Sequence, residues 1–428
     1  HKIAEKVRAE FVLKITGKVA QRAPGQEKSE QKTGEIEIAP EHLEILNRAK
    51  TPPFEIDADV KNEDLRLEFR YLDLRRERLQ KNLQLRHEMT LTIRNFFDQE
   101  KFLDIETPIL VKGTPEGSRE YLVPSRVHPG KFYVLPQSPQ QLKQLLMLAG
   151  YDKYFQVARC FRDEDLRGDR QPEFTQIDFE MSFVESEDVI DVTEKLFVEL
   201  TKKHAGNVDW EKFLENGKMR RMTYRDAMEK YGSDKPDIRF ELELHDLTEI
   251  SKKCGFGVFE NAEKVFGLCV PKSLGEFSRK KIEELESVAK QNGARGLAWY
   301  RIGEESGAVG KNTIEKFRAE LKKEFDANDG DLILFGAGDF LHAVEPLGAV
   351  RLKLGDDLKL RKSNEWAYLW VVDFPMFEKK DDGTVAAQHH PFTSPLAADF
   401  EKLETSPLEC RAQAYDIVLN GVELGGGS

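Results

Sequence analysis

Two stretches in the first half of the chain alternate apolar and polar residues, a pattern typical of strands buried on one face. They are YFQVARCFRDE (residues 154–164) and FTQIDFEMSF (residues 174–183). One face of each is mostly apolar, while the other carries small residues and then charge (Gln156, Ala158, Cys160, Arg162 and Glu164; Gln176, Asp178, Glu180 and Ser182). We therefore predict an antiparallel pair with its apolar side on the core. Its polar side has a floor of small residues, which leaves space for a ligand.

Other patterns surround this pair. Helices are predicted from about residue 62, around Leu85 to Phe96 at 4-4-3 spacing, over much of 200–235, and over AVEPLGAVRLKLG (343–355). Strands are predicted in FLDIETPIL (102–110), in EWAYLWVVDFPMF (365–377), in the short alternating runs before residue 50, and in a hairpin at AYDIVLNGVELGGGS (414–428). Residues 240–342 have compact α/β-like alternation with several glycines, which indicates an inserted domain. The proline-containing segment at 51–57 is typical of a linker.

Composition excludes several classes of protein. With 428 residues, of which 39% are hydrophobic and 33% charged, the chain is typical of a globular protein of about three domains. No apolar run is long enough to cross a membrane, and four widely spaced cysteines form neither a disulfide framework nor a zinc site, so we expect reduced thiols in the cytoplasm. A net charge of -12 disfavours a protein that coats nucleic acid, but allows a local basic surface for one RNA. The chain starts at His1 and stops at GVELGGGS, and we expect that both ends continue in the natural protein.

The loop between the paired strands, FRDEDLRGDRQPEF, is dense in charge. Arg162 would stand on the polar floor, where its planar fork suits a phosphate or carboxylate. Glu164 and Gln171 offer acceptors and a donor for an amine such as that of adenine. A solvated hairpin with weak surface ion pairs is the alternative for such a loop taken alone. The polar face that continues along the return strand favours a ligand site.

The segment QSPQQLKQLL has the residues of a helix start. Ser138 is a candidate N-cap, Pro139 the first helical residue, and Gln141 completes a capping box. Gln140 and Lys143 lie three residues apart, hence on one face of the helix. An acidic small molecule would find a cation and an amide beside the free N–H groups of the first turn. An ordinary amphipathic helix with a surface lysine stays open as the alternative.

A third piece is the terminal hairpin. Asn420-Gly421 predicts a two-residue turn that pairs Val418 with Glu423 and Asp416 with Gly425. Asp416 and Glu423 would then be diagonal neighbours that share a Mg²⁺ ion together with substrate phosphates. The alternative is a pair of solvent-facing acids, which the following glycines disfavour. The loops GTPEGSRE (113–120) and HHPFTSP (389–395) could be plain connectors or ligand clamps, and two successive histidines favour a function.

With these residues in view, the chain resembles the bacterial-type aspartyl-tRNA synthetases, a family of class II aminoacyl-tRNA synthetases. FLDIETPIL resembles the first class II motif, whose Pro108 lies at the dimer interface in that family, and FRDEDLRGDRQPEFTQIDFE resembles the second. The combination of TPEGSREYLVPSR, QSPQQLKQLLM, HHPFTSP and NGVELGGGS resembles the aspartyl enzymes in particular.

The resemblance implies an α+β fold. It consists of a class II antiparallel-sheet catalytic core, a partial N-terminal OB-fold β-barrel and an inserted α/β domain. The expected divisions are a partial OB-fold anticodon-binding domain at 1–50, a linker at 51–80, the first part of the core with motifs 1 and 2 at 81–240, the inserted bacterial-type domain at 241–342, and the second part of the core at 343–428. The third class II motif would follow the last residue. If the chain truly ended there, we would expect little or no activity.

The resemblance also implies residue roles. Arg162 would be the catalytic residue that bridges the α-phosphate of ATP and the aspartate carboxylate. Aspartate would be bound by Glu116, Gln140, Lys143, Arg162, His389 and His390; ATP by Arg162, Asp163, Glu164, Gln171 and Glu423; and Mg²⁺ by Asp416 and Glu423. The implied activity is the joining of L-aspartate to tRNA-Asp through an aspartyl-adenylate, in a homodimer without membrane attachment.

Three alternatives remain open. Charging of tRNA-Asn as well is undecided, because the strands that would read the anticodon are missing. Lys143 and the inserted block disfavour an asparaginyl or lysyl enzyme. The OB-fold with its linker disfavours an amidating ligase on the same core. An inactive paralogue that only binds tRNA or a protein partner is disfavoured by Arg162, Asp416 and Glu423.

Overall fold

The computed structural model describes residues 3–56, 58–114, 116–165, 168, 170–380, 382–390 and 392–428. Its contacts divide the chain into two units, residues 1–92 and 93–428, and α3 (Glu77–Gln99) runs from one into the other. Among the described residues, none of the helices combines the length and apolar character that crossing a membrane requires. All four cysteines are free thiols, as the sequence predicted.

The first unit contains a ribbon of two antiparallel strands, β1 (Val12–Gln21) and β2 (Ile36–Asn47). The register shifts at Val12/Leu13 and again at Thr16/Gly17, and a Cβ on Gly17 would lie 2.2 Å from the carbonyl oxygen of Ala39. Most side chains of both strands are exposed, so the ribbon has little core of its own. A short 3-10 turn (Ala4–Lys6) precedes it, and α1 (Glu63–Glu68) and α2 (Arg70–Asp73) follow it.

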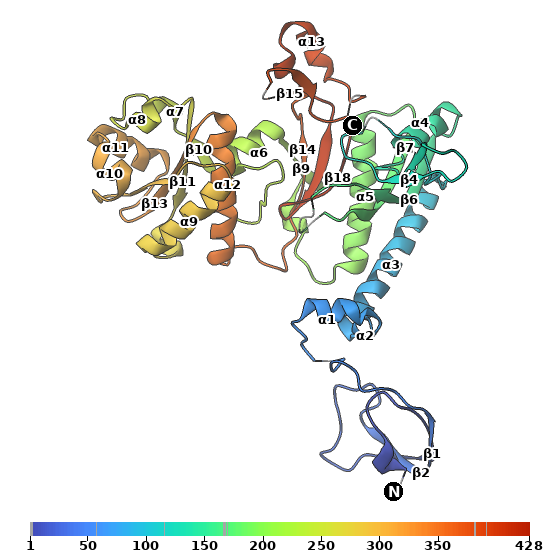
Figure 1. Ribbon diagram of the computed structural model, residues 1–428. Helices are drawn as coiled ribbons and strands as arrows, with labels where there is room; N and C mark the ends of the chain where they lie inside the picture. The colour runs from blue at the N-terminus through green and yellow to red at the C-terminus, as the bar shows by residue number, and fades with distance from the viewer. Residues whose placement is uncertain are drawn as a thin grey trace. The chain divides into compact units, whose positions relative to one another are not determined.

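The second unit has three larger sheets (Figure 1). The first has the order β3-β6-β7, with β3 (Leu103–Asp104) parallel to β6 (Lys153–Phe161) and β6 antiparallel to β7 (Glu173–Met181). Helix α4 (Gln140–Leu148) packs against β6 and β7, and β4 (Leu122–Pro124) pairs with β5 (Phe132–Val134). The predicted strand at 102–110 is therefore mostly wrong: only Leu103 and Asp104 form the ladder with β6, and the N–H of Thr107 donates to the side-chain Oε1 of Gln156 at 3.2 Å.

The second sheet has the order β18-β17-β14-β9-β8, formed by β8 (Leu214–Glu215), β9 (Lys218–Thr223), β14 (Tyr368–Val372), β17 (Tyr415–Leu419) and β18 (Val422–Gly427). Both faces of β14 are buried. Trp370 packs against α5 (Ser186–His204), whereas Leu369 and Val371 pack on the side of α6 (Tyr224–Tyr231). Burial on both faces explains the continuous apolar run of this strand. The helix predicted over much of 200–235 is confirmed only at the end of α5 and in α6, because β8 and β9 lie between them: β9 pairs with distant β14, and β8 pairs with β9.

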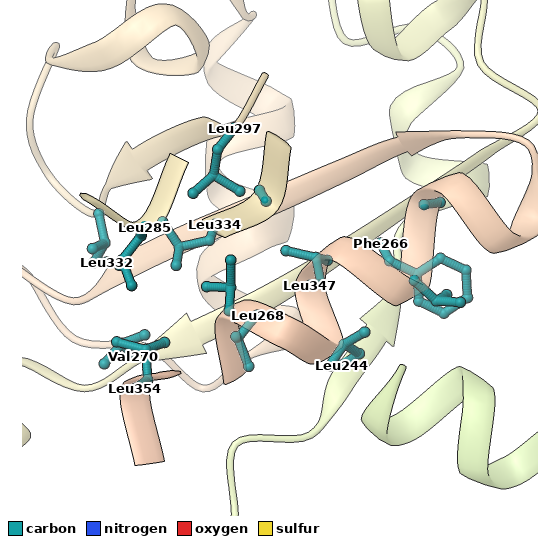
Figure 2. Packing of buried hydrophobic residues seen from close by; sticks show 14 of the residues in the cluster. Leu244, Phe266, Leu268, Val270, Leu285, Leu297, Leu332, Leu334, Leu347 and Leu354 are labelled. Atoms are coloured by element: carbon teal, nitrogen blue, oxygen red, sulfur yellow. The ribbon is translucent and has the colours of Figure 1, made fainter. Parts of the chain in front are cut away.

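The third sheet is antiparallel throughout, with the order β10-β11-β13-β12: β10 (Leu244–Asp246), β11 (Lys264–Val270), β12 (Ala298–Arg301) and β13 (Leu332–Gly338). Figure 2 shows leucines of the strands packed against leucines of α9 (Arg279–Gln291) and α12 (Phe340–Asp357). The other face is covered by a second core that includes α7 (Thr248–Ser251), α8 (Gly257–Glu260), α10 (Gly307–Asn312) and α11 (Glu315–Glu324). Two covered faces give this sheet its own hydrophobic core.

The remaining elements are short. β15 (Phe377–Lys379) pairs with β16 (Val385–Ala387), and α13 (Lys402–Thr405) follows. Further 3-10 turns lie at Glu211–Phe213, Lys272–Leu274, Ala397–Asp399 and Pro407–Glu409. The predicted helix at 343–355 is confirmed within α12 and the predicted terminal hairpin is confirmed as β17 and β18.

Candidate active site

The predicted two-faced strand pair is confirmed by the register of β6 and β7. Gln156 lies opposite Asp178 and Ala158 opposite Gln176, so the polar positions share one face. On the other face, the ring of Phe155 stacks on that of Phe97 at 4.7 Å. The centre of the polar face is covered, however: Asp178 is only 2% exposed, because α4 packs over it. Burying a charged side chain costs free energy unless the charge is paired or hydrogen-bonded, so each charge on this face needs a partner.

Arg162 lies just after β6 and is half-buried. Its backbone N–H donates to the carbonyl of Pro172 at 2.9 Å, and its Nε donates to the carbonyl of Gln137 at 3.4 Å. The guanidinium stands 5.1 Å from the centre of the Phe174 ring. Packing on that ring restricts the guanidinium without occupying its terminal N–H groups.

The loop after Arg162 carries the predicted ATP ligands. The hydroxyl of Ser118 donates to Glu164, and Arg170 pairs with the same carboxylate at 3.2 Å. The Ser118 hydrogen bond and then the positive charges of Arg170 and Arg162 lower the pKa of Glu164. The N–H of Asp163 donates to the carbonyl of Arg119 at 3.1 Å. Gln171 is exposed, and Arg167 of the same loop lies outside the described residues.

Lys143 is the centre of a buried charge cluster. Its Nζ lies 2.7 Å from Oδ1 of Asp178 and 3.2 Å from Oε2 of Glu180, and its side chain is 10% exposed. Burial acts to lower the pKa of Lys143, but the two carboxylates outweigh it and leave the pKa raised. Within the described part of the chain, Oδ2 of Asp178 is buried without a hydrogen-bond partner. One N–H of the ammonium is therefore left for a ligand.

The residues that precede α4 differ from the prediction. The helix begins at Gln140 with Pro139 as its N-cap, so the predicted capping box of Ser138 and Gln141 is wrong. The Ser138 hydroxyl instead donates to Glu116 at 2.9 Å while accepting from the N–H of Gln140 at 3.3 Å. This contact brings Glu116 beside the start of α4.

Gln137 holds the Glu116 loop in place, which the sequence analysis missed. Its Oε1 accepts from the N–H of Ser118 and its Nε2 donates to the carbonyl of Ser118, both at 2.9 Å. Gln137 is 2% exposed. Nothing in the local sequence marks it, because the pairing joins residues 19 apart. Asp178 was also passed over, although it lies on the predicted polar face.

The two histidines occupy different surroundings. The ring of His389 packs edge-on against Phe374 at 5.1 Å, and burial lowers its pKa against the opposing charge of Asp234. Burial also lowers the pKa of His390, where Glu116 acts to raise it and Lys143 to lower it. His390 is thus the histidine in electrostatic range of the Lys143 cluster, and both rings are favoured in the neutral form.

The terminal hairpin places two acids together with a changed register. Val418 pairs with Glu423 as predicted, but Asp416 pairs with Gly426 and not with Gly425, because a bulge follows Ile417. A bulge inserts one extra residue, here in β18. Burial, then Glu423 and then Asp234 raise the pKa of Asp416 to about 7. A Cβ on Gly426 would lie 2.0 Å from Oδ1 of Asp416, so a glycine is needed there.

This acid pair fits a divalent cation. Asp416 is buried beside Glu423 and lacks a positive charge that Mg²⁺ would supply, and Mg²⁺ is held by one or two carboxylates with substrate phosphates. Across the described residues, no group of three or more His, Cys, Asp and Glu side chains is arranged to hold a metal by itself. The pair therefore suits a metal that arrives with a phosphate ligand.

Comparisons with known proteins identify the family of the chain. The family described as "tRNA synthetases class II (D, K and N)" matches residues 62–428. The chain belongs to the class II tRNA synthetases. An aspartate–tRNA ligase of Geobacillus kaustophilus is 51% identical over 433 residues, which covers 99% of this chain and 72% of the relative. An aspartate–tRNA(Asp/Asn) ligase of Bacillus subtilis is 49% identical over 435 residues, with 100% and 72% covered.

Membership settles the coarse chemistry. A class II tRNA synthetase is an α+β enzyme that uses ATP to join an amino acid to tRNA, so ATP is a substrate of this synthetase. The predicted polar face, α4, the Glu116 loop and the β17–β18 hairpin all lie within the matched range.

Proposed function

We propose that this synthetase is an aspartate–tRNA ligase that activates L-aspartate with ATP and transfers it to tRNA-Asp. One observation carries the assignment: about half of the residues are identical, over nearly the whole chain, to ligases named for aspartate. The buried ammonium of Lys143 supports it, because an acidic side chain is the ligand that such a cation selects. Relatives named for tRNA(Asp/Asn) leave tRNA-Asn as a second acceptor to be tested.

Lys143 has the chemistry to select aspartate over asparagine. Its ammonium has three N–H donors, of which Asp178 and Glu180 engage two, so one remains for the side-chain carboxylate of aspartate. Asparagine would present a neutral amide there and lose the attraction between opposite charges in a buried site. We further assign Glu116, Gln140, His389 and His390 to the aspartate pocket.

Activation needs no protein nucleophile. The carboxylate of aspartate attacks the α-phosphorus of ATP in line and pyrophosphate leaves, so catalysis consists of positioning and neutralisation of charge. Arg162 bridges the two substrates with its fork, and Asp163, Glu164 and Gln171 hold the nucleotide. Asp416 and Glu423 would hold Mg²⁺, which supplies positive charge to the phosphates when bound. The terminal ribose hydroxyl of tRNA then attacks the carbonyl carbon of the aspartyl-adenylate, and AMP leaves.

The rest of the chain receives assignments consistent with this role. We place β1 and β2 in a partial OB-fold anticodon-binding domain at 1–50, joined by the linker at 51–80 to the catalytic core at 81–240 and 343–428, with the inserted domain at 241–342. Leu103, Ile109 and Leu110 are exposed around Pro108, which supports a homodimer through this segment, since such residues favour burial against a second copy. Free thiols throughout support a cytoplasmic enzyme.

The test is exchange of labelled pyrophosphate into ATP with aspartate, asparagine or lysine as the only amino acid. We expect exchange with aspartate and at least about 100-fold less with the other two, following the discrimination that one buried polar partner provides. Exchange driven by asparagine or lysine would replace the proposed substrate. Absence of exchange, with tRNA binding retained, would favour the inactive paralogue.

A further inference from the structure

A cluster of arginines lies outside the site described above, in the segment between the β1–β2 ribbon and the long helix α3. Asp73 is 0% exposed, and three guanidinium groups surround its carboxylate. Arg66 donates through Nε at 3.0 Å and through Nη2 at 3.4 Å, Arg76 approaches at 3.4 Å, and Arg70 makes the third ion pair. The cluster thus holds three positive charges and one negative charge on adjacent side chains.

One buried carboxylate cannot use all of these donors. Each guanidinium has five N–H groups, whereas a carboxylate offers about four acceptor positions. Arg76 directs one further N–H to the carbonyl of Ala58 at 2.6 Å. The side chains of Arg66 and Arg76 are 20% and 17% exposed, so their unused donors face a limited opening and not open solvent. Asp73 fixes the orientation of the forks, while the cluster as a whole remains cationic.

A surface depression opens beside this cluster. It is lined by Arg66, Arg76 and Arg78 together with Asp59 and Glu77. Lys81 pairs with Glu77 at 2.7 Å, which offsets the negative charge of Glu77. Arg78 is exposed and makes no ion pair or hydrogen bond with any residue that the structure describes. The guanidinium of Arg78 thus lies beside those of Arg66 and Arg76, which Asp73 holds in place. This arrangement suits an anion.

The surrounding charge supports an anionic ligand of extended form. Residues 59–81, which span the lining of the depression, contain seven basic and six acidic side chains, a local charge of +1 in a chain of net charge -12. The chain belongs to the tRNA synthetases, and along the sequence the cluster lies between the ribbon assigned to anticodon binding and the catalytic core, both of which would bind tRNA. This last step depends on the proposed function and on the assignment of β1 and β2.

We propose that Arg66, Arg76 and Arg78 form a phosphate-binding site for the backbone of tRNA, with Asp73 as the residue that positions two of the three forks. The ligand is a phosphodiester group, which two planar forks bind through paired hydrogen bonds. The site positions tRNA without reading its sequence, since phosphate contacts carry no base information.

Substitution Arg78→Ala tests the site because it removes an exposed side chain that supports no other group. Binding of a tRNA-Asp transcript is measured by fluorescence anisotropy between about 50 and 200 mM KCl, where phosphate contacts are most sensitive to salt. We expect an affinity loss of roughly tenfold at the lower salt, and a slope of log K against log[KCl] that is smaller by about 1. The matched control is Arg295→Ala, which removes an exposed arginine just before β12, and we expect it to leave the slope unchanged.

Two further readouts separate the possible failures. Aspartate-dependent pyrophosphate exchange needs no tRNA and should be the same in the parent and in Arg78→Ala, so its absence in the parent would refute the proposed function alone. Equal salt slopes for the parent, Arg78→Ala and Arg295→Ala would refute the phosphate site alone. Inorganic phosphate should compete no better than chloride at matched ionic strength. Selective competition by millimolar phosphate would assign the depression to a free anion and overturn the tRNA assignment.

Discussion

The buried lysine at the centre of the pocket allows a quantitative prediction. Substitution Lys143→Met keeps the unbranched shape and most of the length of the side chain but removes the charge beside Asp178 and Glu180. Breaking a buried ion pair from one side destabilises a protein by about 3–5 kcal/mol. A carboxylate left without its partner can take up a proton, which sets an upper limit on the loss of stability. Protonating an acid of ordinary pKa at pH 7 costs about 4 kcal/mol. We therefore expect the free energy of unfolding to fall by about 3–4 kcal/mol.

The effect on substrate binding is separate from the effect on stability. The third N–H of Lys143 is assigned to the side chain of aspartate, and a hydrogen bond to a charged group contributes about 1.5–3 kcal/mol. Its loss should raise KM for aspartate roughly 10- to 150-fold in pyrophosphate exchange, while KM for ATP stays within about threefold.

The control is Lys153→Met in the neighbouring strand. Lys153 donates to the carbonyl of Glu100 at 3.2 Å and lies over the ring of Phe102, away from the pocket. It should lower the melting temperature and leave both KM values unchanged. Equal increases of KM for aspartate and for ATP in Lys143→Met would show that the lysine supports the fold of the whole site, and an unchanged KM for aspartate would refute its assignment as a ligand.

Two further predictions concern the hairpin and the segment after the histidine loop. Gly426→Ala places a Cβ within 2.0 Å of Oδ1 of Asp416 and should raise the Mg²⁺ concentration needed for exchange about 10- to 100-fold, whereas Gly425→Ala, whose Cβ meets nothing within 4 Å, should not. Equal behaviour of the two variants would contradict the metal assignment. The hydrogen bonds from Arg411 hold the pKa of Asp399 well below its usual range, so this acid stabilises the fold above about pH 4 and the contribution is lost as pH falls through the lowered pKa. The difference in melting temperature between the parent and Asp399→Asn should therefore be full at pH 7 and shrink below about pH 4; a constant difference would refute the ion-pair explanation.

Local patterns were sufficient where a residue's neighbours in sequence also decide its surroundings. The alternation in β6 and β7 assigned Gln156 and Asp178 to one face, and the Asn420-Gly421 turn fixed the hairpin, because both depend on periodicity and turn geometry. The same reasoning failed for Ser138, whose hydroxyl donates to Glu116 from a distant loop. It failed again at β9, whose polar sequence forms a strand because β14 pairs with it.

The sequence by itself therefore determined the family, the secondary elements that depend on short-range pattern, and the residue types available for chemistry. Tertiary structure decided which of them meet. Three contacts depend on how separate segments pack. They are the ion pair of Lys143 with Asp178, the hydrogen bond of Gln137 with Ser118, and the bulge that places Asp416 opposite Gly426. The physical reason is that the energies of ion pairs and hydrogen bonds depend on distance and burial. The distances and the burial are fixed only when separate elements pack against the same polar face.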